Sequence, residues 1–254
     1  MGWYEDLAGS EIVVMAAGVG VAAGMRSSGG QMTSRQHLLP DNLKIVREWA
    51  TQFERYCPDA IVIMVTNPAD VLTYAAYLSC SKKERRRFLG YDLNDTVRFR
   101  IAVAEALSTP ASQVQGVVVG EHGGSMVPLF SSVKVGGKTV NIPQDVRAKI
   151  LARTSDYLPH MLRLNLPRTS GWLTGVGVAQ MVSAIVKNSG DVIPCCVVVD
   201  GEYGYKNTSL GLPVAIGKQG VKKIIELKLT GEEKKLLDSS EANVQKSIDY
   251  VIAH

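Results

Sequence analysis

Residues 60–68 read AIVIMVTNP. The first six are apolar and rich in β-branched side chains, which is typical of a strand buried on both faces of a sheet. Residues 12–18, IVVMAAG, show the same pattern and end in a glycine. Both runs therefore predict central parallel strands, each followed by a turn.

The segment between these runs has the spacing of a helix. It is expected to be capped by Asp41 or Asn42, and a second helix follows Pro68 over about residues 69–78. A strand, a crossover helix and a parallel strand form a βαβ unit of a doubly wound sheet, whose ligands bind beyond the carboxyl ends of the strands. The apolar face of the first helix comprises Leu43, Val46, Trp49, Ala50 and Phe53.

The second half of the chain has a different organisation. Residues 115–119, 193–199 and 212–216 predict strands, and residues 144–158 and 173–187 predict helices. We expect part of a doubly wound α/β domain over residues 1–90, followed by an α+β domain over residues 91–254. Hairpin-like turns are expected at Gly201, Gly204, Gly211, Gly217 and Gly220.

The C-terminal residues predict a long amphipathic helix. Thr230 and Glu233 have the spacing of a capping box, in which each residue satisfies a backbone N–H near the other. The apolar stripe that follows comprises Leu237, Val244, Ile248 and Val251.

Composition excludes several classes of protein. The 254 residues are 46% hydrophobic and 20% charged, which rules out a disordered chain. The net charge of +4 is mild, and no nucleic-acid partner is expected. No apolar run is long enough to span a membrane, and the N-terminus lacks the pattern of a signal peptide, so a cytoplasmic protein is expected. Free, buried thiols and no metal site are expected from the four cysteines, Cys57, Cys80, Cys195 and Cys196.

Several polar side chains lie in turns or at expected strand ends. His122, in a glycine-rich turn, has a side chain suited to proton transfer, although a lone turn histidine is more often structural. Asp95 and Arg98 share one helix face, which suits either a surface ion pair or a carboxylate–imidazole–guanidinium site. Asn67 fits an ordinary Asn-Pro turn. Between Gly18 and Asn42, a loop rich in glycine and serine carries Arg26 and Arg35, either as a lid over an anionic substrate or as an insertion without function.

Taken in order, the motifs of this chain resemble those of the lactate/malate dehydrogenase family. The resemblance spans nearly the whole chain and includes the closing hairpin and helix over residues 212–238. It implies a Rossmann-like nucleotide-binding fold followed by a substrate domain. The matching stretches are residues 15–18 (MAAG), 65–71 (VTNPADV), 94–100 (NDTVRFR), 120–128 (GEHGGSMVP) and 200–204 (DGEYG).

The resemblance implies a role for each polar residue. His122 is similar to the family's proton donor and acceptor, and Asp95 to the carboxylate that orients it. Arg98 resembles the arginine that binds the substrate carboxylate. Arg35, with Leu38, Leu39 and Asn42 in register, resembles the loop arginine that polarises the substrate carbonyl. Asn67, Gly18 and Ser170 match positions near the cofactor, NAD, with Asn67 also near the substrate oxygen.

This sequence departs from the family pattern at its start and in the loop. The family's opening strand, glycine-rich turn and ribose-binding acidic residue are not found, so the choice between NAD and NADP stays open. Residues 12–17 are then expected at a bare sheet edge, with weak cofactor affinity if the chain stands alone. An insertion near residues 20–31 leaves Arg26 as the available first loop arginine. If Arg26 binds a second carboxylate, malate fits; otherwise lactate is the substrate that fits.

Two functions from different classes follow. The first is an oxidoreductase that transfers a hydride between NAD(H) and a small 2-hydroxy acid, with malate and oxaloacetate favoured and lactate as the alternative. The second is a truncated, non-catalytic remnant of the family. The resemblance also implies a homodimer or homotetramer.

Overall fold

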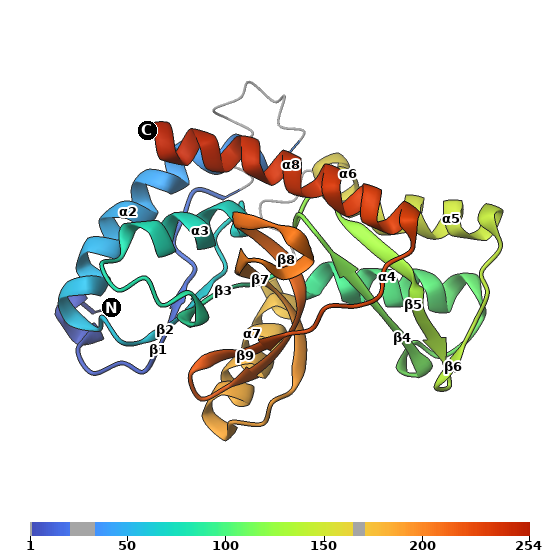
Figure 1. The fold of residues 1–254 in the computed structure, drawn as a ribbon, viewed down its shortest axis with the longest axis horizontal. Coiled ribbons are helices and arrows are strands. Elements are labelled where there is room, and N and C mark those ends of the chain that lie inside the picture. The colour runs from blue at the N-terminus through green and yellow to red at the C-terminus, as the bar shows by residue number, and fades with distance from the viewer. Residues whose placement is uncertain (1, 21–33, 165–170) are drawn as a thin grey trace.

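The computed structural model describes residues 2–20, 34–164 and 171–254. Six strands form one sheet in the order β1-β2-β3-β7-β8-β9, and three form another in the order β4-β5-β6 (Figure 1). The large sheet comprises β1 (Ile12–Met15), β2 (Ile61–Met64), β3 (Phe88–Gly90), β7 (Val192–Asp200), β8 (Lys206–Gly217) and β9 (Gly220–Ile224). The small sheet comprises β4 (Val114–Val119), β5 (Val127–Val135) and β6 (Lys138–Thr139).

Helices connect and cover the strands, and the long C-terminal helix α8 runs across one side of the molecule (Figure 1). The α-helices are α2 (Leu39–Tyr56), α3 (Ala69–Ser79), α4 (Leu93–Ala106), α5 (Gln144–Ser155), α6 (Tyr157–Arg163), α7 (Gly171–Lys187) and α8 (Gly231–Ala253). Short 3-10 turns are η1 (Tyr4–Leu7), η2 (Arg35–Leu38), η3 (Arg85–Arg87), η4 (Ala111–Gln113) and η5 (Glu202–Gly204).

The βαβ unit predicted from the sequence is confirmed. β1 pairs in parallel with β2, β2 pairs in parallel with β3, and α2 is the crossover between the first two strands. The short strand β3 then pairs antiparallel with β7, so the sheet continues from the N-terminal to the C-terminal part of the chain. This continuity brings the carboxyl ends of β1, β2 and β3 beside residues from the second half.

Strands β1 and β2 have similar sequences but different surroundings. All four residues of β2 are buried, as a central parallel strand requires. β1 is at the edge of the described sheet, and Val14 on its outer face is 42% exposed, while Val13 and Met15 are buried. The expectation that this run lies at a sheet edge is therefore confirmed for the described residues.

The expected cap of the first long helix is wrong. Helix α2 begins at Leu39 rather than after Asp41 or Asn42, because the 3-10 turn η2 leads directly into it and Pro40 occupies its first turn. Asn42 is instead a buried helical residue. The predicted apolar face of α2 is buried as expected, and the rings of Trp49 and Phe53 lie 5.0 Å apart.

Three expectations about the second half also need correction. The strand predicted over 212–216 is much longer, because β8 pairs with β7 along nearly its whole length. Gly211 accordingly lies inside β8 and not in a turn. The single helix predicted over 144–158 is divided into α5 and α6.

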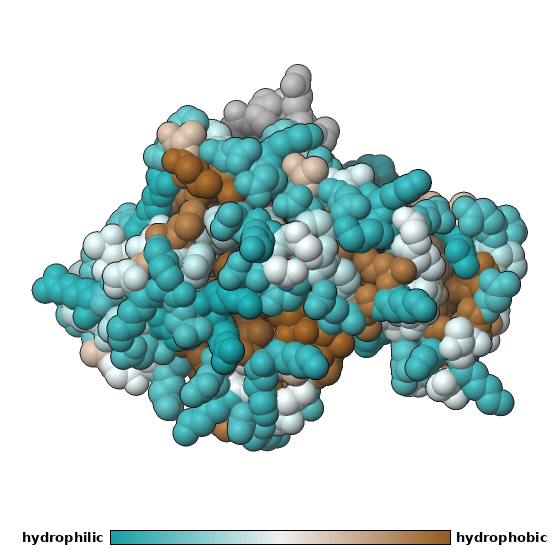
Figure 2. Space-filling view, in the orientation of Figure 1, coloured by the Kyte–Doolittle hydropathy of each residue, from teal (hydrophilic) through white to brown (hydrophobic). Residues whose placement is uncertain are grey.

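Helix α8 confirms the amphipathic pattern of the C-terminus. The Thr230 hydroxyl accepts the Glu233 N–H and the Glu233 carboxylate accepts the Thr230 N–H, forming the predicted capping box. Its apolar stripe is buried, and α8 packs against α3, β5 and β8. The visible face of the molecule is mainly hydrophilic, and hydrophobic side chains show in several separate places, among them the middle of the view and the end of α8 (Figure 2).

All four cysteines are buried and free, as expected. None of the described helices combines the length and the apolarity needed to cross a lipid bilayer.

Candidate active site

The histidine of the glycine-rich turn contacts a carboxylate from a different element. His122 follows β4, and Asp95 lies in the first turn of α4. His122 Nδ1 is 2.6 Å from Asp95 Oδ2, and both residues are buried. A carboxylate only accepts hydrogen bonds, so Nδ1 carries the proton and Nε2 is the nitrogen available for proton exchange.

The charge state of Asp95 follows from its neighbours. Burial opposes ionisation, but the charge and hydrogen bond of His122 and the charges of Arg35 and Arg98 outweigh it. Together they lower the pKa of Asp95 to about 2. Asp95 is therefore an anion at neutral pH and stabilises an imidazolium at His122.

Two arginines adjoin this pair. Arg98 Nη1 is 2.8 Å from Asp95 Oδ1. The Arg98 guanidinium lies 3.6 Å from the centre of the Tyr157 ring, within range of a cation–π contact. Arg35, on η2, is also buried, and burial together with the charge of Arg98 lowers its pKa despite the opposing charge of Asp95. An arginine remains protonated even so, and both guanidiniums are therefore cations.

Asp95, Arg98, Arg35 and Tyr157 line a small cavity of about 160 Å³. Its size fits a molecule of a few carbon atoms, and its two guanidiniums favour an anion. The cavity is lined by Ser34, Arg35, Asp95, Arg98, Gly123, Gly124, Met126, Thr154, Ser155, Tyr157 and Pro159.

The turns after β1 and β2 are joined by one buried side chain. Asn42 Oδ1 accepts the Val19 N–H, and Asn42 Nδ2 donates to the carbonyl of Asn67 at 2.7 Å. Gly18 lies so close to this contact that a Cβ there would be 2.5 Å from Thr66 and 2.9 Å from Asn42. Asn42 therefore holds the ends of both strands together, whereas the sequence predicts a helix cap at this position.

Asn67 has a feature that fits a bound cofactor. Its side-chain Oδ1 is buried and has no hydrogen-bond partner among the described residues. A buried amide oxygen is costly to leave unpaired, and donors of a ligand satisfy such groups. Asn67 and Gly18 lie at the carboxyl ends of neighbouring parallel strands, where dinucleotides bind in doubly wound sheets. The residues present thus fit the nicotinamide end of NAD.

The structure brings together most of the residues predicted from the sequence. Asp95, Arg98 and Arg35 line one cavity, and His122 contacts Asp95. Asn67 and Gly18 lie at neighbouring strand ends, where each adjoins Asn42. Arg26 and Ser170 lie outside the described residues.

Sequence reasoning missed three groups around the histidine. Asp70, inside the VTNPADV motif, accepts the His122 N–H at 2.8 Å, and its position in that motif was the available signal. Gln36 donates to Glu121 at 3.0 Å and accepts from Ser247 of α8, which ties the segment of Arg35 to the histidine turn. Tyr157 gave no recognisable signal, because its role depends on the break between α5 and α6.

Two family models match the chain. Residues 1–90 match the lactate/malate dehydrogenase NAD binding domain, and residues 94–254 match the lactate/malate dehydrogenase alpha/beta C-terminal domain. The chain belongs to the lactate/malate dehydrogenase family. It is therefore an NAD-dependent dehydrogenase with a Rossmann-type fold, in which the first three strands of the large sheet are parallel, as the sequence motifs implied.

Similar members of the lactate/malate dehydrogenase family include curated malate dehydrogenases of bacteria. That of Cytophaga hutchinsonii is 37% identical over 246 residues, which cover 95% of this chain and 75% of the relative. That of Desulforudis audaxviator is 36% identical over 244 residues, with coverages of 95% and 76%. The chain thus spans about three quarters of the length of these relatives.

Solved structures of both branches of the lactate/malate dehydrogenase family resemble the fold. Malate dehydrogenase of Cryptosporidium parvum superposes with a TM-score of 0.92 at 29% identity, covering 100% of this chain and 81% of that one. Lactate dehydrogenase of the same organism, solved with lactic acid and β-nicotinamide adenine dinucleotide, gives a TM-score of 0.90 at 30% identity, with coverages of 100% and 80%.

Proposed function

We propose that this dehydrogenase interconverts malate and oxaloacetate, with His122 and Asp95 as its catalytic residues. The observation that carries this proposal is a small cavity lined by Arg35, Arg98 and Asp95, in which the Asp95 carboxylate also contacts the buried His122 imidazole. The malate dehydrogenases among the curated relatives favour malate, and lactate is the alternative.

The reaction requires a proton and a hydride to reach the same carbonyl group. NAD, when bound in its reduced form, supplies the hydride to the carbonyl carbon. The His122 imidazolium donates its Nε2 proton to the carbonyl oxygen, and Asp95 stabilises the imidazolium beforehand. The product alcohol gains one hydride and one proton, and oxidation of malate reverses both transfers.

The arginines act on the two ends of the substrate. Arg98 holds the 1-carboxylate, since a guanidinium matches the geometry of a carboxylate. Arg35 stabilises the negative charge that develops on the carbonyl oxygen. Arg26 is the residue proposed to bind the second carboxylate of malate. Asn67, Gly18 and Ser170 are proposed to contact the cofactor.

The experiment that tests this function is NADH oxidation by the purified chain, offered oxaloacetate and pyruvate in parallel. We expect turnover with oxaloacetate that His122→Ala abolishes. Turnover with pyruvate alone would indicate a lactate dehydrogenase. If a folded sample turns over neither acid, the chain is a non-catalytic member of its family.

We propose a boundary between two domains near residue 90, with the nucleotide-binding part over residues 1–90 and the substrate part over residues 91–254. We also propose a homodimer or homotetramer in the cytoplasm. Trp172 and Val176 support self-association, because they expose 94% and 59% of their surfaces on one helix, α7. Sedimentation equilibrium measures the assembly, and a monomer at micromolar concentration contradicts it.

A further inference from the structure

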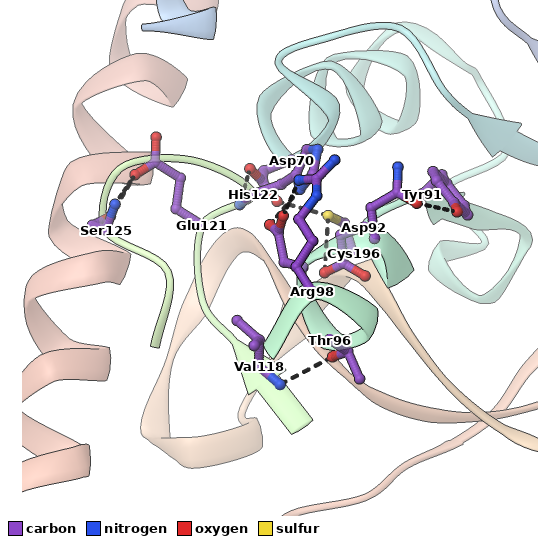
Figure 3. A network of polar contacts seen from close by, with 12 residues as sticks. Asp70, Tyr91, Asp92, Thr96, Arg98, Val118, Glu121, His122, Ser125 and Cys196 are labelled. Atoms are coloured by element: carbon purple, nitrogen blue, oxygen red, sulfur yellow. Dashed lines mark hydrogen bonds and ion pairs between the residues drawn. The ribbon is translucent and has the colours of Figure 1, made fainter. Parts of the chain in front are cut away.

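A second group of acidic side chains lies beside His122, around the thiol of Cys196 (Figure 3). Asp70, in the first turn of α3, has no exposed surface. One of its carboxylate oxygens accepts the His122 N–H at 2.8 Å, and the other accepts the Cys196 S–H at 2.7 Å. The same sulfur lies 3.7 Å from Asp92 Oδ2.

Asp70 and Asp92 differ in their hydrogen-bond donors. Both oxygens of Asp70 receive a donor, which favours its ionised form. Burial and the nearby carboxyl groups raise the pKa of the Cys196 thiol, so the thiol remains protonated and donates. Asp92 Oδ1 is buried and has no partner among the described residues. The surroundings of Asp92 therefore favour the neutral, protonated form of its carboxyl group.

The backbone around this cluster is shaped to hold it. Gly211 lies in β8, and a Cβ at this position would overlap with Asp92 Oδ2. Only glycine therefore leaves room for the Asp92 carboxyl group. The backbones of Gly120 and Gly211 exchange two hydrogen bonds, each of 2.9 Å, directly before the histidine turn. The acidic cluster is thus built into the junction between the two sheets.

We propose that Asp70 is a positioning residue for His122. Its carboxylate fixes the histidine backbone and places a second negative charge beside the imidazole, while the Asp92 carboxyl group, across the Cys196 thiol, stays neutral. This proposal rests on the proposed function and deepens it. Asp70 contributes to the charge environment of the proton donor, His122, without touching the substrate.

Asp70 and His122 are coupled through charge as well as through the hydrogen bond. Burial raises the pKa of Asp70 to about 6, although the charge of His122, the thiol and the His122 N–H act in the opposite direction. The Asp70 carboxyl group thus becomes charged in the same pH range in which a histidine titrates. Among the described residues, the other charged or titratable groups around the pair include Arg35, Asp92, Asp95, Arg98, Glu121, Tyr157 and Cys196.

The test follows the histidine ring signals of the full chain by NMR as pH changes, without substrate or cofactor. The sequence has only four histidines, and loss of one signal in His122→Gln assigns the relevant ring. In Asp70→Asn the amide oxygen still accepts the His122 N–H, so the variant removes the charge and keeps the contact. We expect the midpoint of the His122 titration to fall by about 1 pH unit in this variant.

Asp92→Asn is the matched control. It makes the same chemical change on the other side of the thiol, where the carboxyl group is already neutral, so the midpoint should stay where it is. An unchanged midpoint in folded Asp70→Asn, or equal shifts in both variants, overturns the proposal.

A measurement on the unsubstituted chain covers the case in which Asp70→Asn does not fold. The ¹³C signal of the Asp70 carboxyl group should titrate with a midpoint near pH 6. If this signal is still that of a neutral acid at pH 8, where the proposal requires a carboxylate, the proposal is wrong. Neither measurement involves turnover, so a chain without activity refutes the proposed function and leaves this test intact.

Discussion

Asp95 and Asp70 both contact His122 and both are buried. The pKa values of their carboxyl groups nevertheless depart from that of an ordinary aspartate in opposite directions. Asp95 binds the ring beside two arginines, and the pKa of its carboxyl group falls to about 2. Asp70 binds the backbone beside a thiol and another acid, and burial raises its pKa to about 6. Burial alone therefore does not decide the charge of these carboxyl groups. The partner decides it, because only Asp95 has cations close enough to offset the loss of water.

The largest expected effect is on turnover, and it comes from removing the negative charge of Asp95 beside the His122 ring. Asp95→Asn should lower kcat for oxaloacetate reduction by about 10²- to 10⁴-fold, since the imidazolium loses its stabilising anion and its fixed tautomer. Steady-state NADH oxidation measures it. Asp92→Asn serves as the control for replacing a buried aspartate nearby, and equal losses in the two variants contradict the assignment.

The next effect is on stability and comes from Asp70. Its folded pKa of about 6 lies above the ordinary value of 3.8, so the folded chain binds this proton more tightly than the unfolded chain. The contribution to stability is complete below pH 4 and is lost as pH rises to about 6, by about 3 kcal/mol. Urea unfolding at a series of pH values should show this loss in the natural chain and not in Asp70→Asn.

Asp95 should show the opposite sign in a lower pH window. Its folded pKa of about 2 lies below the ordinary value of 3.8. Its contribution is therefore present above pH 4 and is lost as pH falls toward 2, by about 2 kcal/mol. The difference in unfolding free energy between the natural chain and Asp95→Asn, measured from pH 2 to pH 5, reports this contribution. If this difference in unfolding free energy is constant from pH 2 to pH 5, Asp95 does not have the lowered pKa that distinguishes it from Asp70.

A smaller effect isolates the thiol. Cys196→Ala removes the S–H donor to Asp70 and should raise the midpoint of the Asp70 carboxyl titration by roughly half a pH unit to one unit. Cys196→Ser keeps a donor and should leave the midpoint nearer to that of the natural chain. Carboxyl ¹³C NMR compares the two variants, and identical midpoints would show that the thiol does not stabilise the anion.

The smallest effect concerns the ring over Arg98. Tyr157→Ala should raise KM for oxaloacetate by roughly 2- to 5-fold, because the guanidinium loses a cation–π contact. Tyr157→Phe keeps the ring face and should have nearly the KM of the natural chain. A rise in KM that is as large in the phenylalanine variant points to the hydroxyl group instead.

Sequence reasoning recovered what is periodic or carried by a contiguous motif. The buried pattern of residues 61–64 and the face of the helix over 39–56 are visible because neighbouring positions repeat at a fixed spacing. His122, Asp95 and Arg98 were found through the order of the family motifs. Asn42 was misread as a cap, since Asn is common at helix starts and nothing local shows that it is buried between two strand ends.

The sequence by itself determined the parallel strands, the capped C-terminal helix and the set of groups that carry the chemistry, because each depends on residues close together in the chain. The tertiary structure alone decided which carboxyl groups are charged. Asp70, Asp92 and Asp95 are the same amino acid in one short stretch of the chain. Their charge states depend on a histidine after β4, a thiol in β7 and arginines from η2 and α4, which only folding brings together.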